Sequence, residues 1–159
     1  MSLWKEQVLY DSRVSITRLR FRLLMLAVAA GLLAIALTIR AVAAGPLNST
    51  GRLEQYSGTA LYASMAYVGV LFLWPRRSPL TAGAIAWAWC WAVECFQLTG
   101  IPAGLSARSL LARLVLGVQF DPTDLLWYLP GIIPLVVMHE VLSRSRRTRT
   151  ERFRRGTLR

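Results

Sequence analysis

Histidine, cysteine and acidic residues are scarce in this sequence. Its 159 residues include one histidine, two cysteines and eight Asp or Glu residues, against 19 Lys or Arg residues. His139 has no second metal ligand and no nucleophile paired with it, so the sequence predicts no metal site, no cofactor and no catalytic residue, and it does not favour an enzyme. Cys90 and Cys95 fall on different faces of one predicted helix, which excludes a disulfide between them.

Apolar residues dominate instead. The chain is 55% hydrophobic and only 17% charged, which is too apolar for an ordinary soluble domain and is typical of a small membrane protein of one domain. The net charge of +11 is concentrated at both chain ends and in one short loop. Because this distribution follows membrane topology, it argues against nucleic acid as a partner.

Hydrophobic segments predict an all-α membrane protein with four transmembrane helices and one short amphipathic or re-entrant helix. We expect spans at about residues 21–39, 57–74, 80–99 and 123–142, and the short helix at 105–117. Residues 1–20 are predicted as a cytoplasmic segment, either a short interfacial helix or a frayed tail, and residues 143–159 as a disordered basic cytoplasmic tail. The four-helix transmembrane domain would occupy residues 21–142.

The first span is expected to remain in the mature protein. Ala41-Val42-Ala43 looks like a signal-peptide cleavage site, so a signal peptide is the rival interpretation. The apolar run before it is longer than the usual hydrophobic region of a signal peptide, and Arg40 interrupts the approach to the site.

Basic residues predict the orientation of the spans. With both termini in the cytoplasm, 15 of the 19 Lys and Arg residues lie inside and four lie outside. We therefore expect a multi-pass protein of the cytoplasmic (inner) membrane with both termini cytoplasmic. The lipid bilayer is one predicted partner, and anionic lipids are another, bound by the arginine-rich tail.

The third predicted span carries the main candidate for a functional site. Ala82, Ala86, Cys90 and Glu94 recur at four-residue spacing, and Gln97 lies on the same face. This pattern predicts a seam of small residues that leads to a carboxyl group. Because an ionisable side chain inside a span is costly, it usually faces protein and marks a functional site.

Small residues are also prominent in the second span, where they predict close helix contacts; they are Gly58, Ala63, Ala66 and Gly69. The fourth span is predicted to begin with Asp121 as its N-cap and Pro122 in its first turn, with Asp124 as either a capping acid or a site residue. Pro130 and Pro134 should kink this helix.

A buried carboxylate in a membrane requires a partner. Arg113 shares one face of the short helix with Ser106 and Ser109, whereas Arg108 falls nearly opposite them. We therefore predict an ion pair between Glu94 and Arg113 rather than Arg108.

The region from Glu94 to Gly131 resembles a known family. The matching pattern is Glu94-x-x-Gln97, then Arg108, then Arg113-Leu114-Val115-Leu116-Gly117-x-x-Phe120, then Asp124-Leu125-x-x-Tyr128-x-x-Gly131. It resembles a bacterial family of small integral membrane proteins catalogued as a domain of unknown function, and more distantly the VanZ-like proteins, which are associated with low-level teicoplanin resistance. The resemblance implies a fold and a polar cluster, but no activity. The predicted cluster is Glu94, Gln97, Arg108, Arg113, Asp124 and Tyr128.

Three functions remain open at this point. The first is a cell-envelope membrane protein whose outer-side polar cluster binds a lipid headgroup or a small ligand. The second is a small proton-coupled transporter subunit, which would need to form a homo-oligomer because four spans are few. The third is a purely structural role in which Glu94 and an arginine tie the loop to the bundle. An accessible cavity at Glu94 favours a site, whereas an enclosed, fully paired carboxylate favours a tie.

Overall fold

The computed structural model describes residues 2–43 and 52–156, and the described chain is helical without any strand. Its helices are α1 (Ser2–Ala43), α2 (Arg52–Leu73), α3 (Pro79–Gln97), α4 (Ile101–Ser106), α5 (Leu110–Leu116) and α6 (Asp124–Gly156). The prediction of an all-α protein is therefore confirmed.

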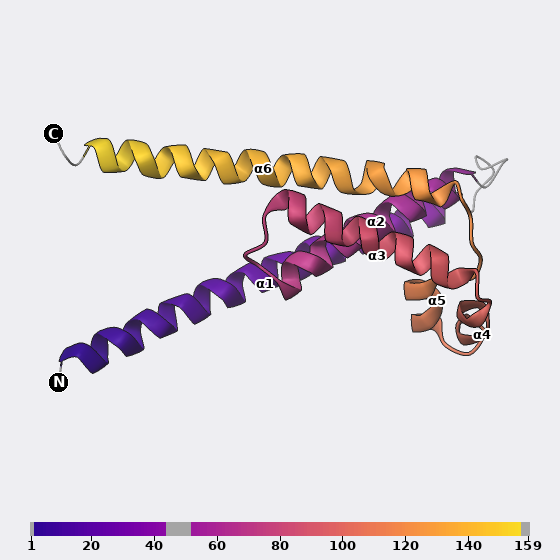
Figure 1. The fold of residues 1–159 in the computed structure, drawn as a ribbon, viewed down its shortest axis with the longest axis horizontal. Coiled ribbons are helices and arrows are strands. Elements are labelled where there is room, and N and C mark those ends of the chain that lie inside the picture. Colours follow the sequence, from indigo (N-terminus) through magenta and orange to yellow (C-terminus); the bar gives the residue numbers. More distant parts are fainter. Residues whose placement is uncertain (1, 44–51, 157–159) are drawn as a thin grey trace.

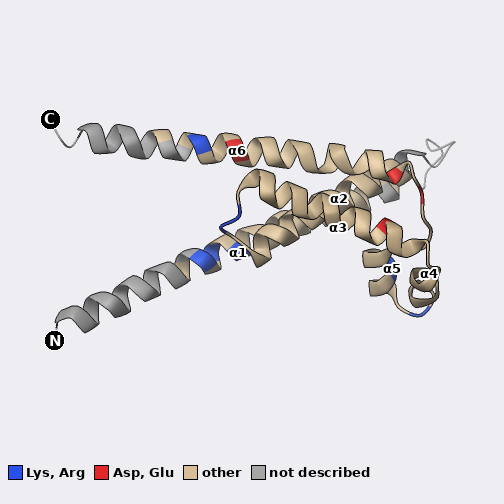
Figure 2. Ribbon diagram, in the orientation of Figure 1, with Lys and Arg blue, Asp and Glu red and all other residues tan. Residues whose placement is uncertain are grey.

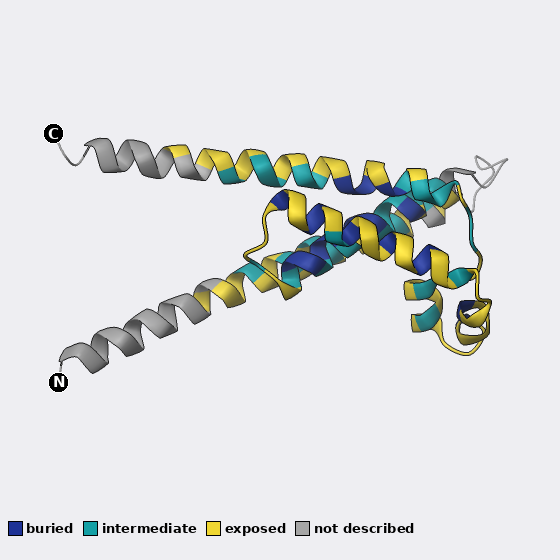
Figure 3. Ribbon diagram, in the orientation of Figure 1, coloured by how far each residue is buried: buried dark blue, intermediate teal, exposed yellow. Residues whose placement is uncertain are grey.

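Helix α2 lies at the centre of the arrangement shown in Figure 1. It packs against α1, α3 and α6, and α3 also packs against α6. The short helices α4 and α5 pack on each other and on α3, at the end of the bundle away from the two chain termini. Buried residues are concentrated where α2, α3 and α6 face one another, whereas most of the described surface of α1 is exposed (Figure 3).

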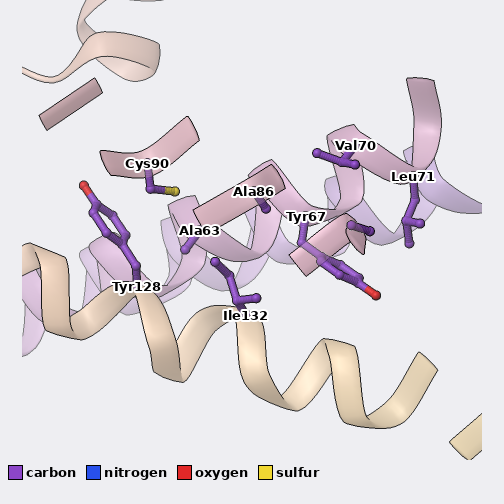
Figure 4. Close-up of a cluster of buried hydrophobic side chains, with 9 residues drawn as sticks. Ala63, Tyr67, Val70, Leu71, Ala86, Cys90, Tyr128 and Ile132 are labelled. Atoms are coloured by element: carbon purple, nitrogen blue, oxygen red, sulfur yellow. The ribbon is translucent and has the colours of Figure 1, made fainter. Parts of the chain in front are cut away.

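Small side chains form the centre of the core (Figure 4). Ala63 of α2 and Ala82, Ala86 and Cys90 of α3 are fully buried. This confirms the predicted seam on the third apolar segment. Since these side chains are short, α3 can approach α2 and α6 closely, and Tyr67, Tyr128 and Ile132 fill the space between the helices.

The closest contact between α2 and α6 involves Gly131. A Cβ atom at this position would lie 2.0 Å from the carbonyl oxygen of Ala60, so the two backbones touch. Ser64 of α2 also donates a hydrogen bond of 2.8 Å to the Gly131 carbonyl. The predicted contacts at Gly58 and Gly69 were wrong, because a Cβ at either position would meet nothing within 4 Å.

Both prolines of α6 lie inside a continuous helix. Helix α6 runs through Pro130 and Pro134 without a break, and the kink predicted at these residues stays a prediction. Proline at position 134 leaves the Pro130 carbonyl without its helical donor. The Ser64 hydroxyl binds the adjacent Gly131 carbonyl, so α2 supports the helix next to this gap.

In the described part of the chain, three helices, rather than the predicted four, are long and apolar enough to cross a membrane by length and composition. These segments are Arg18–Ile39, Gln55–Leu73 and Asp124–Ser145. They agree with three of the predicted spans to within a few residues. Helix α3 has 19 residues but is not among them; its last turns hold the polar residues Glu94 and Gln97.

The segment between α3 and α6 contains two short helices where the sequence predicted one at 105–117. Helix α4 follows Gly100, whose φ of 72° lies in the left-handed region. The chain then turns at Ala107 and Arg108. Ser109 starts α5 because its hydroxyl accepts a hydrogen bond of 3.3 Å from the Ala112 amide.

The two ends of the chain are more helical than the sequence indicated. Helix α1 starts at Ser2 and continues into the first apolar segment, and α6 continues to Gly156 through the tail that we predicted to be disordered. No proline or glycine interrupts residues 2–30 or 135–155, so nothing local ends either helix. Arg144 and Glu140, one turn apart on α6, form an ion pair of 2.9 Å.

Both chain termini lie at one end of the bundle, and α4 and α5 lie at the other (Figure 1). The turn between α2 and α3, which carries Arg76 and Arg77, is on the side of the termini (Figure 2). The fold therefore has two chemically different ends.

Candidate functional site

An open cavity of about 430 Å³ lies between α2, α3, α5 and the start of α6. Its lining combines carboxyl, hydroxyl and amide groups with a few apolar side chains, and it is on the side of the bundle where α4 and α5 pack. The lining residues are Gln55, Gly58, Thr59, Tyr62, Val93, Glu94, Gln97, Leu114, Val115, Gly117, Asp124 and Tyr128. We call this the carboxyl pocket.

Glu94 forms the inner wall of the carboxyl pocket. It is 2% exposed, and the hydroxyl of Tyr128, which is 3% exposed, donates a short hydrogen bond to its Oε1 atom. The Asp121 amide makes a longer contact of 3.4 Å with Oε2. The carboxyl of α3 is therefore bound by α6 and by the loop that precedes it.

The predicted ion pair between Glu94 and Arg113 was wrong. Among the described residues, the carboxyl oxygens of Glu94 contact Tyr128 and Asp121, and no arginine lies within ion-pair distance. Arg113 and Arg108 are exposed and do not line the carboxyl pocket. The neutral hydroxyl of Tyr128 can satisfy the carboxyl without the desolvation of a second charge.

Helix α2 supplies polar groups that the sequence analysis missed. The Thr59 hydroxyl donates a hydrogen bond of 3.0 Å to Oδ1 of Asp124, and the Gln55 amide donates one of 2.6 Å to Oδ2 of Asp121. Gln55, Thr59 and Tyr62 follow one another at spacings of four and three residues, so they share one helix face. This spacing was the signal available in the sequence.

Asp121 accepts hydrogen bonds from two backbone amides at the start of α6. Its Oδ1 atom accepts a hydrogen bond of 2.8 Å from the Thr123 amide, and its backbone carbonyl accepts one of 3.0 Å from the Asp124 amide. Helix α6 begins at Asp124, so Asp121 lies in the turn that precedes the helix and not at the N-cap position that the sequence predicted. Hydrogen bonds from Thr123, and then from Gln55, lower the pKa of the Asp121 carboxyl, so it carries a negative charge at neutral pH.

Three side chains bind consecutive carbonyls at the end of α5. Tyr62 donates to Val115 at 2.8 Å, Gln97 donates to Leu116 at 2.7 Å, and Ser106 donates to Gly117 at 2.6 Å. Each donor comes from a different helix, namely α2, α3 and α4. Because the last carbonyls of a helix lack intrahelical donors, these bonds fix α5 over the carboxyl pocket.

Gly117 is required where α5 ends. Its φ of 68° is a backbone conformation that other residues rarely adopt. A Cβ atom there would also lie 2.5 Å from Nε2 of Gln97. The Oε1 atom of Gln97 is buried and has no hydrogen-bond partner among the described residues.

The structure therefore brings together four of the six predicted cluster residues and leaves two outside. Glu94, Gln97, Asp124 and Tyr128 line the carboxyl pocket. The described residues contain no group of three or more His, Cys, Asp or Glu side chains that could hold a metal ion.

A family model described as "Protein of unknown function (DUF2809)" matches residues 49–132, more than half of the chain. The chain belongs to this family. Every residue that lines the carboxyl pocket lies within the DUF2809 match, whereas the described part of α1 and the later turns of α6 lie outside it. The sequence predicted membership of such a family, and this is confirmed. The more distant likeness to VanZ-like proteins stays a prediction.

No curated protein and no solved structure matches the chain. The chemistry of the DUF2809 pocket must therefore be argued from its own residues. The described lining presents the carboxyl groups of Glu94 and Asp124 beside the rings of Tyr62 and Tyr128, and the described lining residues include no lysine, arginine or histidine. Such a surface accepts hydrogen bonds and favours positive charge.

Proposed function

We propose that this DUF2809 protein is a four-span protein of the bacterial cytoplasmic membrane whose carboxyl pocket binds an ammonium-bearing headgroup or small ligand. The first support comes from α3, which packs against α2 and α6 and carries three exposed tryptophans, Trp87, Trp89 and Trp91. Its 19 residues are close to the length that a bilayer span requires, about 20 residues.

With α3 as a span, the carboxyl pocket opens on the outer side of the membrane and the termini lie in the cytoplasm. The basic residues support this orientation, because Arg76 and Arg77 lie on the same side of the bundle as the termini. The basic tail would then face the anionic inner leaflet, where we propose that it binds anionic lipid.

Reporter fusions test the topology. We expect a reporter active only in the periplasm to be silent when fused after Arg159 and active when inserted at Ser49, because 15 of 19 basic residues lie on the proposed cytoplasmic side. A reporter active only in the cytoplasm should give the reverse pattern. Periplasmic activity at Arg159 would contradict the proposed orientation.

The carboxyl pocket itself is the observation that carries the ligand proposal. Its volume of about 430 Å³ lies in the range of small-molecule sites, roughly 300–1,000 Å³. Asp124 lies at its outer part, held by Thr59, and Glu94 lies at its base, held by Tyr128. Two carboxyl groups beside two tyrosine rings match an ammonium group, which donates hydrogen bonds and is attracted to the face of an aromatic ring.

Lipid binding by the full-length protein in detergent tests this proposal. Native mass spectrometry should show that the carboxyl pocket, which Asp124 lines, binds phosphatidylethanolamine more tightly than phosphatidylglycerol with the same acyl chains. Asp124→Asn should weaken phosphatidylethanolamine binding roughly tenfold, because a hydrogen bond to a charged group is lost. Glu140→Gln removes an exposed carboxylate elsewhere on α6 and should leave this affinity unchanged.

Free ethanolamine distinguishes the two sources of the ammonium group. If it binds as well as the lipid and competes with it, the ligand is a small molecule. If neither binds, or if Asp124→Asn and Glu140→Gln have equal effects, the ligand proposal fails. The structural function would then be favoured, because the Tyr128 hydrogen bond to Glu94 joins α6 to α3.

A further inference from the structure

A second cavity, of about 420 Å³, lies at the opposite end of the bundle, between α1 and the turn that joins α2 to α3. Four of its seven described lining residues are arginines. The lining residues are Arg18, Arg22, Leu73, Trp74, Pro75, Arg76 and Arg77. We call this the arginine pocket; its basic residues form the blue region beside the α2–α3 turn in Figure 2.

Two rigid elements hold these arginines. Arg18 and Arg22 are one helical turn apart on α1, and the guanidinium carbon of Arg22 lies 5.6 Å from the centre of the Phe72 ring. On the other wall, the Arg77 amide donates a hydrogen bond of 3.1 Å to the Trp74 carbonyl, which closes the turn. The Arg22 side chain and the Arg77 backbone are thus held by contacts that do not depend on a ligand.

The turn ends where α3 begins. Ser78 is the N-cap of α3, and its hydroxyl accepts a hydrogen bond of 3.2 Å from the Thr81 amide. Pro79 occupies the first turn and has a restricted φ. Because α2 ends and α3 starts within a few residues, Arg76 and Arg77 cannot move far from α1.

No described acidic side chain balances this charge. Among the residues that the structure describes, the lining of the arginine pocket includes no Asp or Glu, and none of its four arginines forms an ion pair. Four like charges around one cavity repel one another, so an anion that enters it gains attraction and relieves repulsion.

The rim of the arginine pocket carries exposed apolar side chains. Leu19, Leu23, Leu73 and Trp74 are exposed apolar side chains at the same end of α1 and α2. Tryptophan is enriched where the hydrocarbon core meets the headgroups, which is also the level of lipid phosphates. Guanidinium groups bind phosphate oxygens through paired hydrogen bonds.

We infer that the arginine pocket binds a phosphate-bearing anion, and that its apolar rim selects the phosphodiester of an anionic phospholipid over free phosphate. Arg76 and Arg77 contact the phosphate from the turn, and Arg18 and Arg22 contact it from α1. This site is separate from the carboxyl pocket and from the basic tail, and it joins α1 to the rest of the bundle through the bound lipid.

Binding of short-chain phosphatidylglycerol and phosphatidylcholine to the full-length protein, measured by native mass spectrometry in detergent, tests the inference. The double variant Arg76→Gln, Arg77→Gln should bind phosphatidylglycerol at least about tenfold more weakly than the parent protein. The variant Arg18→Gln, Arg22→Gln, which removes the other wall, should show a similar loss. The variant Arg76→Lys, Arg77→Lys should keep part of the affinity that the glutamine variant loses, because lysine keeps the charge but cannot form the paired hydrogen bonds of arginine.

A matched control removes the same charge elsewhere. Arg108→Gln, Arg113→Gln lies at the opposite end of the bundle and should keep the parent affinity for this site. Circular dichroism and size-exclusion profiles check that each variant is folded; the four pocket arginines are all exposed, so we expect no loss of fold.

The inference fails if phosphatidylcholine binds as tightly as phosphatidylglycerol. It also fails if the control pair loses as much affinity as the pocket pairs, because net charge alone would then explain binding. Inorganic phosphate is the remaining arm of the test. If it binds without lipid and displaces phosphatidylglycerol at similar concentration, the selection of lipid over free phosphate is overturned.

Discussion

Gly131→Ala is expected to lower the free energy of unfolding by about 3 kcal/mol, the upper end of the usual range for overpacking. The new methyl group would lie 2.0 Å from the Ala60 carbonyl oxygen and 2.8 Å from its carbon. These atoms belong to the backbone of α2, so no rotamer change can make room. The two helices must separate, which also weakens the Ser64 hydrogen bond to Gly131.

The melting temperature of the purified protein in detergent measures this effect. Gly69→Ala is the matched control, because a Cβ atom at Gly69 meets nothing within 4 Å. Alanine also has the better helix propensity, by roughly 1 kcal/mol, so the control should be neutral or slightly stabilising. Equal melting temperatures for the two variants would show that the backbones of α2 and α6 are not in contact at this point.

Glu94→Ala is the second substitution with a large expected effect, also about 3 kcal/mol of destabilisation. It leaves the buried hydroxyl of Tyr128 without its acceptor and opens space at the base of the carboxyl pocket. Glu94→Gln should be milder, because the amide oxygen can still accept the Tyr128 hydrogen bond. Tyr128→Phe should be intermediate between these two variants, since it removes one of the two contacts that the Glu94 carboxyl makes with Tyr128 and Asp121.

A double-mutant cycle identifies the partner of Glu94. Glu94→Ala combined with Tyr128→Phe should lose about 1 kcal/mol less than the sum of the single variants, a coupling energy in the range measured within membranes. Glu94→Ala combined with Arg113→Ala should be additive, because Arg113 is exposed and does not contact the carboxyl. If Glu94 were coupled to Arg113 and not to Tyr128, the result would support the ion pair that the sequence alone predicted.

The error about Arg113 has a physical cause. A helical wheel gives the relative directions of side chains on one helix, but it carries no information about where a neighbouring helix lies. Ser106 and Arg113 were assigned to one helix face, whereas the chain turns at Ala107 and Arg108 and places them on two helices. Ser106 then points to the Gly117 carbonyl, and Arg113 remains outside.

The polar groups of α2 were missed for a related reason. Thr59 and Gln55 are ordinary residues near the start of an apolar helix, and nothing local separates them from a solvated turn. They became recognisable only when Asp121 and Asp124, more than 60 residues later, were found as their hydrogen-bond partners. Contacts between residues so far apart in the sequence depend on how the helices pack. The hydrophobic period of one segment carries no information about that packing.

The sequence by itself determined the features that depend on local chemistry. Long apolar runs define where α1, α2 and α6 can cross a bilayer, the spacing of Ala82, Ala86 and Cys90 defines the buried face of α3, and the cost of a charge in that setting identified Glu94 as a buried polar centre. Tertiary structure decided which groups form hydrogen bonds with the Glu94 carboxyl and which residues surround it. Only packing brings Tyr128 to Glu94, opens a cavity beside them, and gathers arginines from α1 and the α2–α3 turn at the other end. Hydrophobicity and helical period act over a few residues, whereas each of these sites is made by side chains that lie far apart in the sequence.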